Sequence, residues 1–146
     1  MSVVNLLTYN RPGPRLLTGT LVCGGCGTPM DRGLGRGRSR SSYRCPAAVG
    51  CGRARIVEPE LDDVVYAAIV GALKSAKRAS IAETMKGHDG EVSTDVVRFR
   101  RQWEAQGLEW KRALVRRLLK EIVVHPDAGA VPVRGRPGRV ELVWRR

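Results

Sequence analysis

The sequence is poor in aromatic side chains and contains no long apolar run. Only 5% of its 146 residues are aromatic, with a single Phe, so a small lobe of this chain has little apolar core and needs another means of stabilisation. No stretch approaches the roughly 18 apolar residues of a membrane span, and the opening MSVVNLLTYN lacks the basic and apolar regions of a secretory signal. We therefore expect a cytoplasmic protein that does not bind membranes.

Acidic residues are also scarce, and they are unevenly placed. The chain has 26 Lys and Arg against 14 Asp and Glu, a net charge of +12. Residues 11–55 carry nine Arg and one Asp, residues 97–146 carry thirteen basic and five acidic groups, and residues 56–96 have a net charge of −4. A GC-rich coding sequence is an alternative explanation of this charge, because the codons of Arg are rich in G and C. Two basic ends nevertheless favour a polyanionic partner, because each cation laid against a phosphate releases a counterion.

Four cysteines form the clearest motif in the chain. They occur as a C-x2-C pair and a C-x5-C pair separated by 18 residues: Cys23, Cys26, Cys45 and Cys51. A C-x-x-C turn presents two thiolates to one ion, and Gly27 and Gly52, each directly after the second cysteine of its pair, permit such turns. Four sulfurs close the coordination shell, so the motif predicts a structural zinc site.

Three other chemistries compete with zinc binding at these cysteines. A thioredoxin-like redox pair would open a helix, which the glycines and Pro29 disfavour. Disulfides are rare in the reducing cytoplasm. An iron–sulfur cluster uses the same ligands, and spacing alone leaves that alternative open. His88 and His125 lie far from both pairs in sequence, and we expect ordinary surface or packed histidines at these positions.

The segment between the pairs, DRGLGRGRSRSSYRC, is a basic hairpin rich in glycine. Its alternative is a solvated loop without a ligand. Further Arg residues follow the second pair, so we favour contact with double-stranded DNA, where Arg binds phosphates and reads guanine. The predicted DNA-binding residues are Arg32, Arg36, Arg38, Arg40, Arg44, Arg53 and Arg55.

Helical spacing begins after VEPE. The first predicted helix has the apolar residues Leu61, Val64, Val65, Ala68, Ile69, Ala72 and Leu73 on one side. A second is predicted over 95–121, capped by Ser93 or Thr94 and open to interruption at Gly107. Its apolar side comprises Trp103, Leu114, Val115, Leu118, Leu119 and Ile122.

These patterns predict an α+β fold: a small zinc β-ribbon, two helices and a C-terminal β-hairpin. Residues 1–15, ending in NRPGPR, read as a linker remnant. Short runs separated by glycine-rich turns over 16–57 indicate a ribbon of antiparallel strands. Residues 58–146 form the helical region, which closes with EIVVHP and RVELVW as a hairpin. We expect this C-terminal region to fold without the metal.

The stretches LLTGTLVCGGCGTPMDR, SYRCPAAVGCGRARIVEPELDDVV and RALVRRLLKEIVVHP followed by GRVELVW resemble, in this order, the C-terminal region of large serine recombinases of the phage-integrase and transposase type. The resemblance runs from about residue 12 to residue 146. It implies a zinc β-ribbon that grips the outer part of an attachment half-site, with the four cysteines as zinc ligands and the Arg-rich ribbon facing DNA. It also implies a role in DNA recombination and integration by a mobile element.

The resolvase-like catalytic domain of that family, with its nucleophilic serine, has no counterpart in this sequence. Ser39, Ser41 and Ser42 lie in the ribbon with no base to activate them, so we expect no enzymatic activity. The leading hypothesis is a noncatalytic DNA-binding fragment of a serine recombinase. A second is a module that pairs with an intact recombinase, or with itself, through its helices. A third is a ribbon that serves RNA or the transcription machinery.

Overall fold

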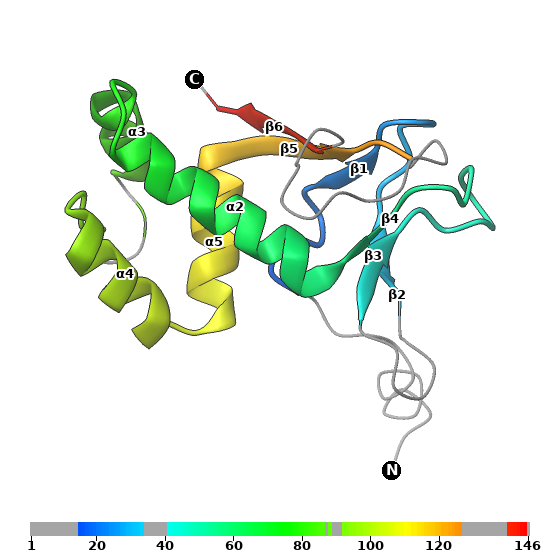
Figure 1. The fold of residues 1–146 in the computed structure, drawn as a ribbon, viewed down its shortest axis with the longest axis horizontal. Helices are drawn as coiled ribbons and strands as arrows, with labels where there is room; N and C mark the ends of the chain where they lie inside the picture. Colours follow the sequence, from blue (N-terminus) through cyan, green and yellow to red (C-terminus); the bar gives the residue numbers. More distant parts are fainter. Residues whose placement is uncertain (1–14, 34–40, 87, 89–91, 127–139, 146) are drawn as a thin grey trace, which may run out of the picture.

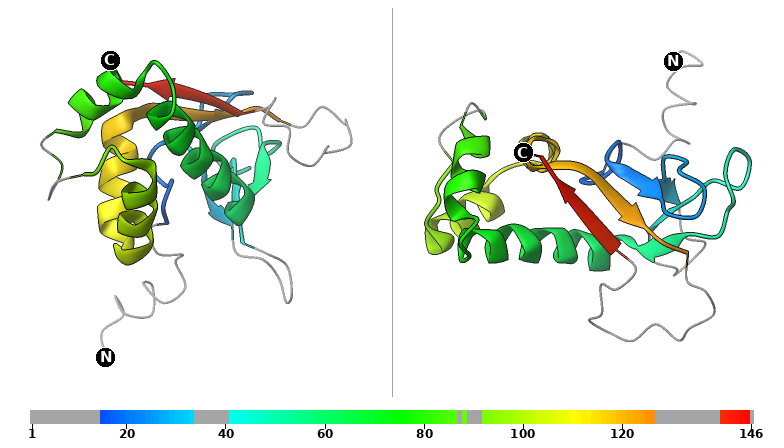
Figure 2. Two further views of the ribbon diagram at one scale, coloured as in Figure 1. Left: turned by 60° about the vertical axis from the view of Figure 1, so that its left-hand side comes forward. Right: turned by 90° about the horizontal axis from the view of Figure 1, so that it is seen from above.

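The computed structural model describes residues 15–33, 41–86, 88, 92–126 and 140–145. The fold is α+β, as predicted, and its elements are shown in Figures 1 and 2. In chain order they are β1 (Leu21–Cys23), β2 (Asp31–Gly33), β3 (Ser42–Arg44), β4 (Arg55–Val57), α2 (Glu58–Leu73), α3 (Arg78–Met85), α4 (Val96–Ala105), α5 (Leu108–Leu118), β5 (Leu119–Val124) and β6 (Val140–Trp144). No helix in the described ranges has the length and apolar character that crossing a membrane demands.

The ribbon is an antiparallel sheet of order β2-β3-β4. Tyr43 on β3 lies opposite Ile56 on β4, and both side chains are buried. The neighbouring pair, Arg44 and Arg55, is exposed. Successive side chains of a strand alternate between faces, so the ribbon has one face on the core, and its other face carries the exposed Arg44 and Arg55 beside the buried Ser42.

β1 is not a strand of the β2-β3-β4 sheet. Its antiparallel pairing within 16–57, which the sequence predicted, is limited to the bridge between Val22 and Pro29. β1 pairs in parallel with β5, Leu21 opposite Ile122 and Cys23 opposite Val124, in a second sheet of order β1-β5-β6. Strands β5 and β6 form the predicted C-terminal hairpin. The pairing of β1 with β5 therefore links the two regions that were predicted to meet at residue 57. Independent folding of the C-terminal region stays a prediction.

The described part of residues 58–146 contains four helices where two were expected. The first stretch ends at Leu73, and the hydroxyl of Ser75 donates to the carbonyl of Ala72 at 2.8 Å before α3 begins. Such a local hydrogen bond competes with the helix. In the second stretch Gly107 is extended, with φ −80° and ψ 175°, and separates α4 from α5.

Two boundaries of the second stretch were predicted wrongly. The cap of α4 is Asp95, not Ser93 or Thr94, and its carboxylate accepts from the backbone N–H of Arg98 at 3.0 Å. The helix expected to reach residue 121 ends at Leu118, and the chain runs directly into β5. Leu119 and Ile122 are buried on this strand, because an apolar residue fits a helix or a strand equally well in a short run.

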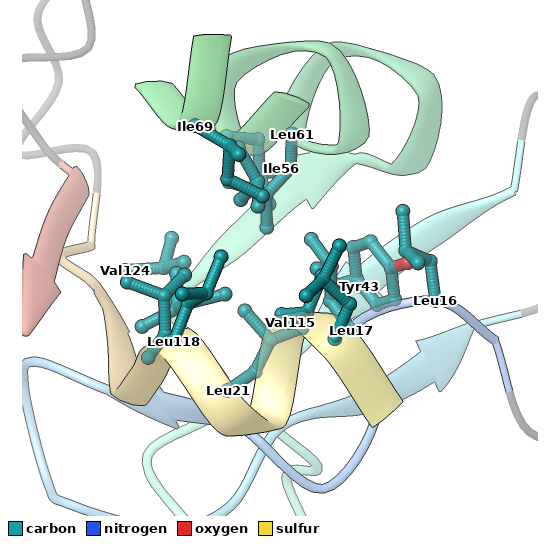
Figure 3. Close-up of a cluster of buried hydrophobic side chains, with 14 of the residues drawn as sticks. Leu16, Leu17, Leu21, Tyr43, Ile56, Leu61, Ile69, Val115, Leu118 and Val124 are labelled. Atoms are coloured by element: carbon teal, nitrogen blue, oxygen red, sulfur yellow. The ribbon is translucent and has the colours of Figure 1, made fainter. Parts of the chain in front are cut away.

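One apolar core joins the helices to strands of both sheets. Leu61 and Ile69 on α2 face Val115 and Leu118 on α5, with Leu21 of β1 beside α5 (Figure 3). All five are at most 1% exposed. The ribbon contributes Tyr43 and Ile56 to the same cluster.

Candidate metal centre

The four cysteine sulfurs converge on one point. All four Sγ atoms lie within 4.8 Å of one another. Cys23 and Cys51 are 3.5 Å apart, Cys26 and Cys45 are 3.6 Å apart, and Cys45 and Cys51 are 4.0 Å apart. Tetrahedral zinc with Zn–S bonds of about 2.3 Å requires sulfurs about 3.8 Å apart, so the distances fit one zinc ion.

The spacing also bears on the iron–sulfur alternative. In a cluster of several irons the cysteines ligate different metal atoms, which spreads their sulfurs more widely than a single ion does. Four sulfurs within 4.8 Å of one another match a mononuclear centre. The donor set supports zinc in a structural role.

Each pair of cysteines sits in a turn that glycine makes possible. Gly27 after Cys26 has φ +76°, and Gly52 after Cys51 has φ +70°, which confirms the parallel between the pairs. In the first turn the N–H of Gly27 donates to the carbonyl of Cys23 at 2.8 Å. In the second, a Cβ on Gly50 would lie 2.5 Å from Cys45 Sγ, so only glycine lets the loop pass the sulfur.

The thiols differ in acidity. Hydrogen bonding with the Thr28 hydroxyl, 3.2 Å from Cys26 Sγ, and with the backbone of Cys51 lowers the pKa of Cys26 to about 6. The backbone N–H of Arg53 lowers the pKa of Cys51, whereas burial raises the pKa of Cys45 to about 11. A divalent cation at their centre would favour the thiolate form of all four, since metal ligands bind deprotonated.

The first turn packs against the end of β5. The N–H of Gly24 donates to the carbonyl of Val124 at 2.9 Å. A Cβ on Gly24 would lie 2.2 Å from Nδ1 of His125, whose Nε2 is 3.2 Å from the Glu141 carboxylate on β6. Sequence reasoning missed this contact. The double glycine inside CGGC was its only signal, because close approach of another segment requires residues without a side chain.

Residues 16–70 match the family model of the recombinase zinc beta ribbon domain. The matched segment contains all four cysteines and ends within α2, and it supports a recombinase-related fragment. It covers less than half of the chain. No curated protein and no solved structure matches the sequence.

The ribbon within the matched segment is fixed to α2 by polar contacts. The Tyr43 hydroxyl donates to Asp62 Oδ1 at 2.8 Å, and Arg15 Nε donates to Glu58 Oε1 at 2.6 Å. The Glu58 side chain is buried. Asp62 is partly buried, and this burial raises the pKa of its carboxyl group to about 6. Burial and the neighbouring Asp62 raise the pKa of Tyr43, so its hydroxyl stays a donor.

Four of the seven predicted DNA-binding arginines lie within the described residues. Arg44 and Arg55 are opposite each other on the solvent face of the zinc ribbon, and Arg53 is exposed beside Cys51. Arg32 is on β2, and its backbone pairs with Tyr43 on β3. The three remaining predictions, Arg36, Arg38 and Arg40, lie outside the described residues.

Proposed function

We propose that this chain is a noncatalytic, zinc-dependent DNA-binding fragment of a site-specific serine recombinase, which contacts attachment-site DNA during recombination. The observation that carries the proposal is the recombinase zinc ribbon, with its sulfurs in tetrahedral spacing and one face lined by arginine. The core holds the other face, so the basic face is the one presented to a ligand.

The pairing of Arg44 with Arg55 supports a polyanionic ligand. Like charges directly opposite each other on antiparallel strands destabilise a sheet. Two guanidinium groups on neighbouring strands can both donate charge-assisted hydrogen bonds to the oxygens of one phosphate group.

The surroundings of the serines and histidines support a noncatalytic role. Ser42 is buried on β3, where no solvent-borne substrate reaches it. His88 lies edge-on to Trp110 at 4.8 Å, and His125 faces Glu141. Among the described residues, neither histidine forms a hydrogen bond with Ser42, as the base that activates a serine nucleophile would.

The test is the salt dependence of duplex binding, measured by gel shift or fluorescence anisotropy on the zinc-loaded protein. Arg44→Ala with Arg55→Ala should reduce the slope of log affinity against log salt by about 1.8, at about 0.9 per phosphate contact. Arg36→Ala with Arg38→Ala and Arg40→Ala should reduce it by about 2.7 on the same basis. Both variants should retain zinc, because these side chains are not ligands.

The matched control is Lys77→Ala with Arg78→Ala, two exposed cations at the start of α3, remote from the ribbon (Figure 1). Its slope should equal that of the original protein. An unchanged slope in folded, zinc-loaded ribbon variants would remove the ribbon from the DNA interface. It would favour the alternative in which the helices pair with an intact recombinase.

A further inference from the structure

A pocket separate from the metal centre lies between α2, α4 and α5. Its volume is about 380 Å³, within the range of about 300–1,000 Å³ typical of sites for small ligands. Residues of three helices and of the turn before β1 line it: Leu16, Asp62, Asp63, Tyr66, Trp103, Glu104, Leu108 and Lys111. We call this site the acidic aromatic pocket.

One wall of the pocket is aromatic and firmly supported. The ring centroids of Tyr66 and Trp103 are 5.4 Å apart, and the buried ring of Phe99 lies 6.3 Å from the first and 6.0 Å from the second. The ammonium group of Lys111 sits 5.4 Å from the centre of the Trp103 ring. This wall therefore already holds one cation, through the attraction between a positive charge and an aromatic face.

The remaining wall is acidic, although the chain as a whole has a charge of +12. Asp62, Asp63 and Glu104 outnumber the single Lys111, which gives the lining a net charge of −2 when all are ionised. Asp63 and Glu104 are exposed and take part in no ion pair within the part of the chain that the structure describes. Two carboxylates are thus available to an incoming cation.

We propose that the acidic aromatic pocket binds an arginine side chain presented by a partner protein. A guanidinium group stacks on an aromatic face and donates hydrogen bonds to two carboxylates through its planar fork, which suits this combination of walls better than the compact charge of lysine does. The exposed rim at Asp63, Glu104 and Leu108 leaves room for the backbone that carries the arginine. Phosphates would be repelled, so the inference is independent of DNA binding by the ribbon.

The test uses the whole zinc-loaded chain and the peptide acetyl-Gly-Arg-Gly-amide. The three tryptophans give three indole N–H signals in a nitrogen–proton correlation spectrum, and Trp103→Phe assigns the one in the pocket. Titration should move the Trp103 signal saturably. The same peptide with citrulline, which has nearly the shape of arginine without its charge, should leave it in place.

Variants of the two walls sharpen the result. Asp63→Asn with Glu104→Gln should weaken peptide binding about tenfold, which corresponds to about 1.4 kcal/mol. Lys111→Met, which keeps an apolar stem and removes the internal cation, should strengthen it. Glu109→Gln, an exposed carboxylate of α5 outside the pocket, serves as the control and should change nothing.

The proposal is overturned if the citrulline peptide binds equally well, if the Trp103 signal does not shift, or if the Asp63 and Glu104 variant binds as the original does. Each variant is first required to give a dispersed spectrum that matches the original outside the pocket. Failure of this titration leaves the salt dependence of the ribbon untouched, so the two proposals are refuted separately.

Discussion

Removal of the metal should disorder the C-terminal hairpin as well as the ribbon. The sequence suggested that the C-terminal region folds without metal. Because β1 pairs with β5, we expect instead that loss of the metal also affects this region. Cys23 is both a predicted zinc ligand and the last residue of β1. When the metal leaves, the turn that anchors β1 loses its constraint.

The contacts at stake are comparable with the stability of a whole domain. The N–H of Ile122 donates to the carbonyl of Thr20, and the N–H of Gly24 donates to that of Val124, each at 2.9 Å. Leu17 and Leu21 are at most 1% exposed. These hydrogen bonds and buried leucines contribute on the order of 6 kcal/mol, against a typical total of about 5–15 kcal/mol. Without β1, β5 retains only β6 in its sheet, and a lone hairpin is marginally stable.

Hydrogen exchange measured by mass spectrometry tests this. Amides of residues 119–124 and 140–144 should be protected in the zinc-loaded protein and should exchange much faster after chelation, with recovery on adding zinc back. A reductant is required throughout, because Cys23 and Cys51 are close enough to form a disulfide after small shifts. Cys26→Ser should behave as the chelated protein does, whereas Ala48→Ser, in the loop before Cys51, should keep its zinc.

Unchanged protection of β5 and β6 in protein shown by mass spectrometry to be metal-free would refute the reasoning. The C-terminal region would then be an independent unit, and the β1 pairing would contribute little. A native mass that shows no bound metal even in zinc-replete protein would instead refute the metal assignment.

Three further outcomes follow from burial and backbone geometry. Leu118→Asp should lower the free energy of unfolding by more than about 4 kcal/mol, because it buries an unpaired charge, and a thermal melt should show the chain unfolded. Val97 is 61% exposed, so the control Val97→Asp should lower that free energy by less than about 0.5 kcal/mol. Since the pKa of Asp62 is raised to about 6, the folded protein binds its proton more tightly than the unfolded chain does, and stability falls as pH rises from about 4 to 6. Asp62→Asn should flatten that dependence in melts across this range and raise the melting temperature at pH 7; an unaltered pH profile would contradict it. Gly27→Ala should cost about 1 kcal/mol in denaturant unfolding because of its positive φ alone, and Gly52→Ala should cost more because its Cβ would also meet a neighbouring alanine at 2.9 Å; equal costs would argue against that contact.

The metal site was predictable from sequence because its information is local. Each pair of cysteines and its glycines specify a turn, and the two turns need only be brought together. The partner of β1 was not predictable, since residues 21–23 are short and parallel pairing with a strand about 100 residues later leaves no local signal. The same holds for His125, which sequence distance separates from the cysteines and the fold places against Gly24.

The helices show the opposite limit. Apolar spacing located them, but their ends depend on single polar groups and on competition with strands. Asp95 caps α4 because its carboxylate accepts a hydrogen bond from the N–H of Arg98. Ser93 and Thr94 are also residue types that cap helices, so the sequence alone did not distinguish them from Asp95. At residue 119 the helix stops because the hairpin with β6 takes over the backbone hydrogen bonds, and that choice is made by tertiary pairing.

β1 leads directly into the first cysteine turn and pairs with β5, a strand far along the chain. This arrangement has a consequence for synthesis on the ribosome. The last of the four cysteines is residue 51, whereas the strand with which β1 pairs is completed only at residue 124. At about 5–20 residues per second, β1 waits roughly 5–20 s for its partner. Metal capture during that interval would hold the strand near its final geometry and shield its edge from other nascent chains. In cells short of zinc, more of the chain should therefore aggregate as the time between synthesis of β1 and of β5 grows. This should hold even if the folded protein releases its metal slowly.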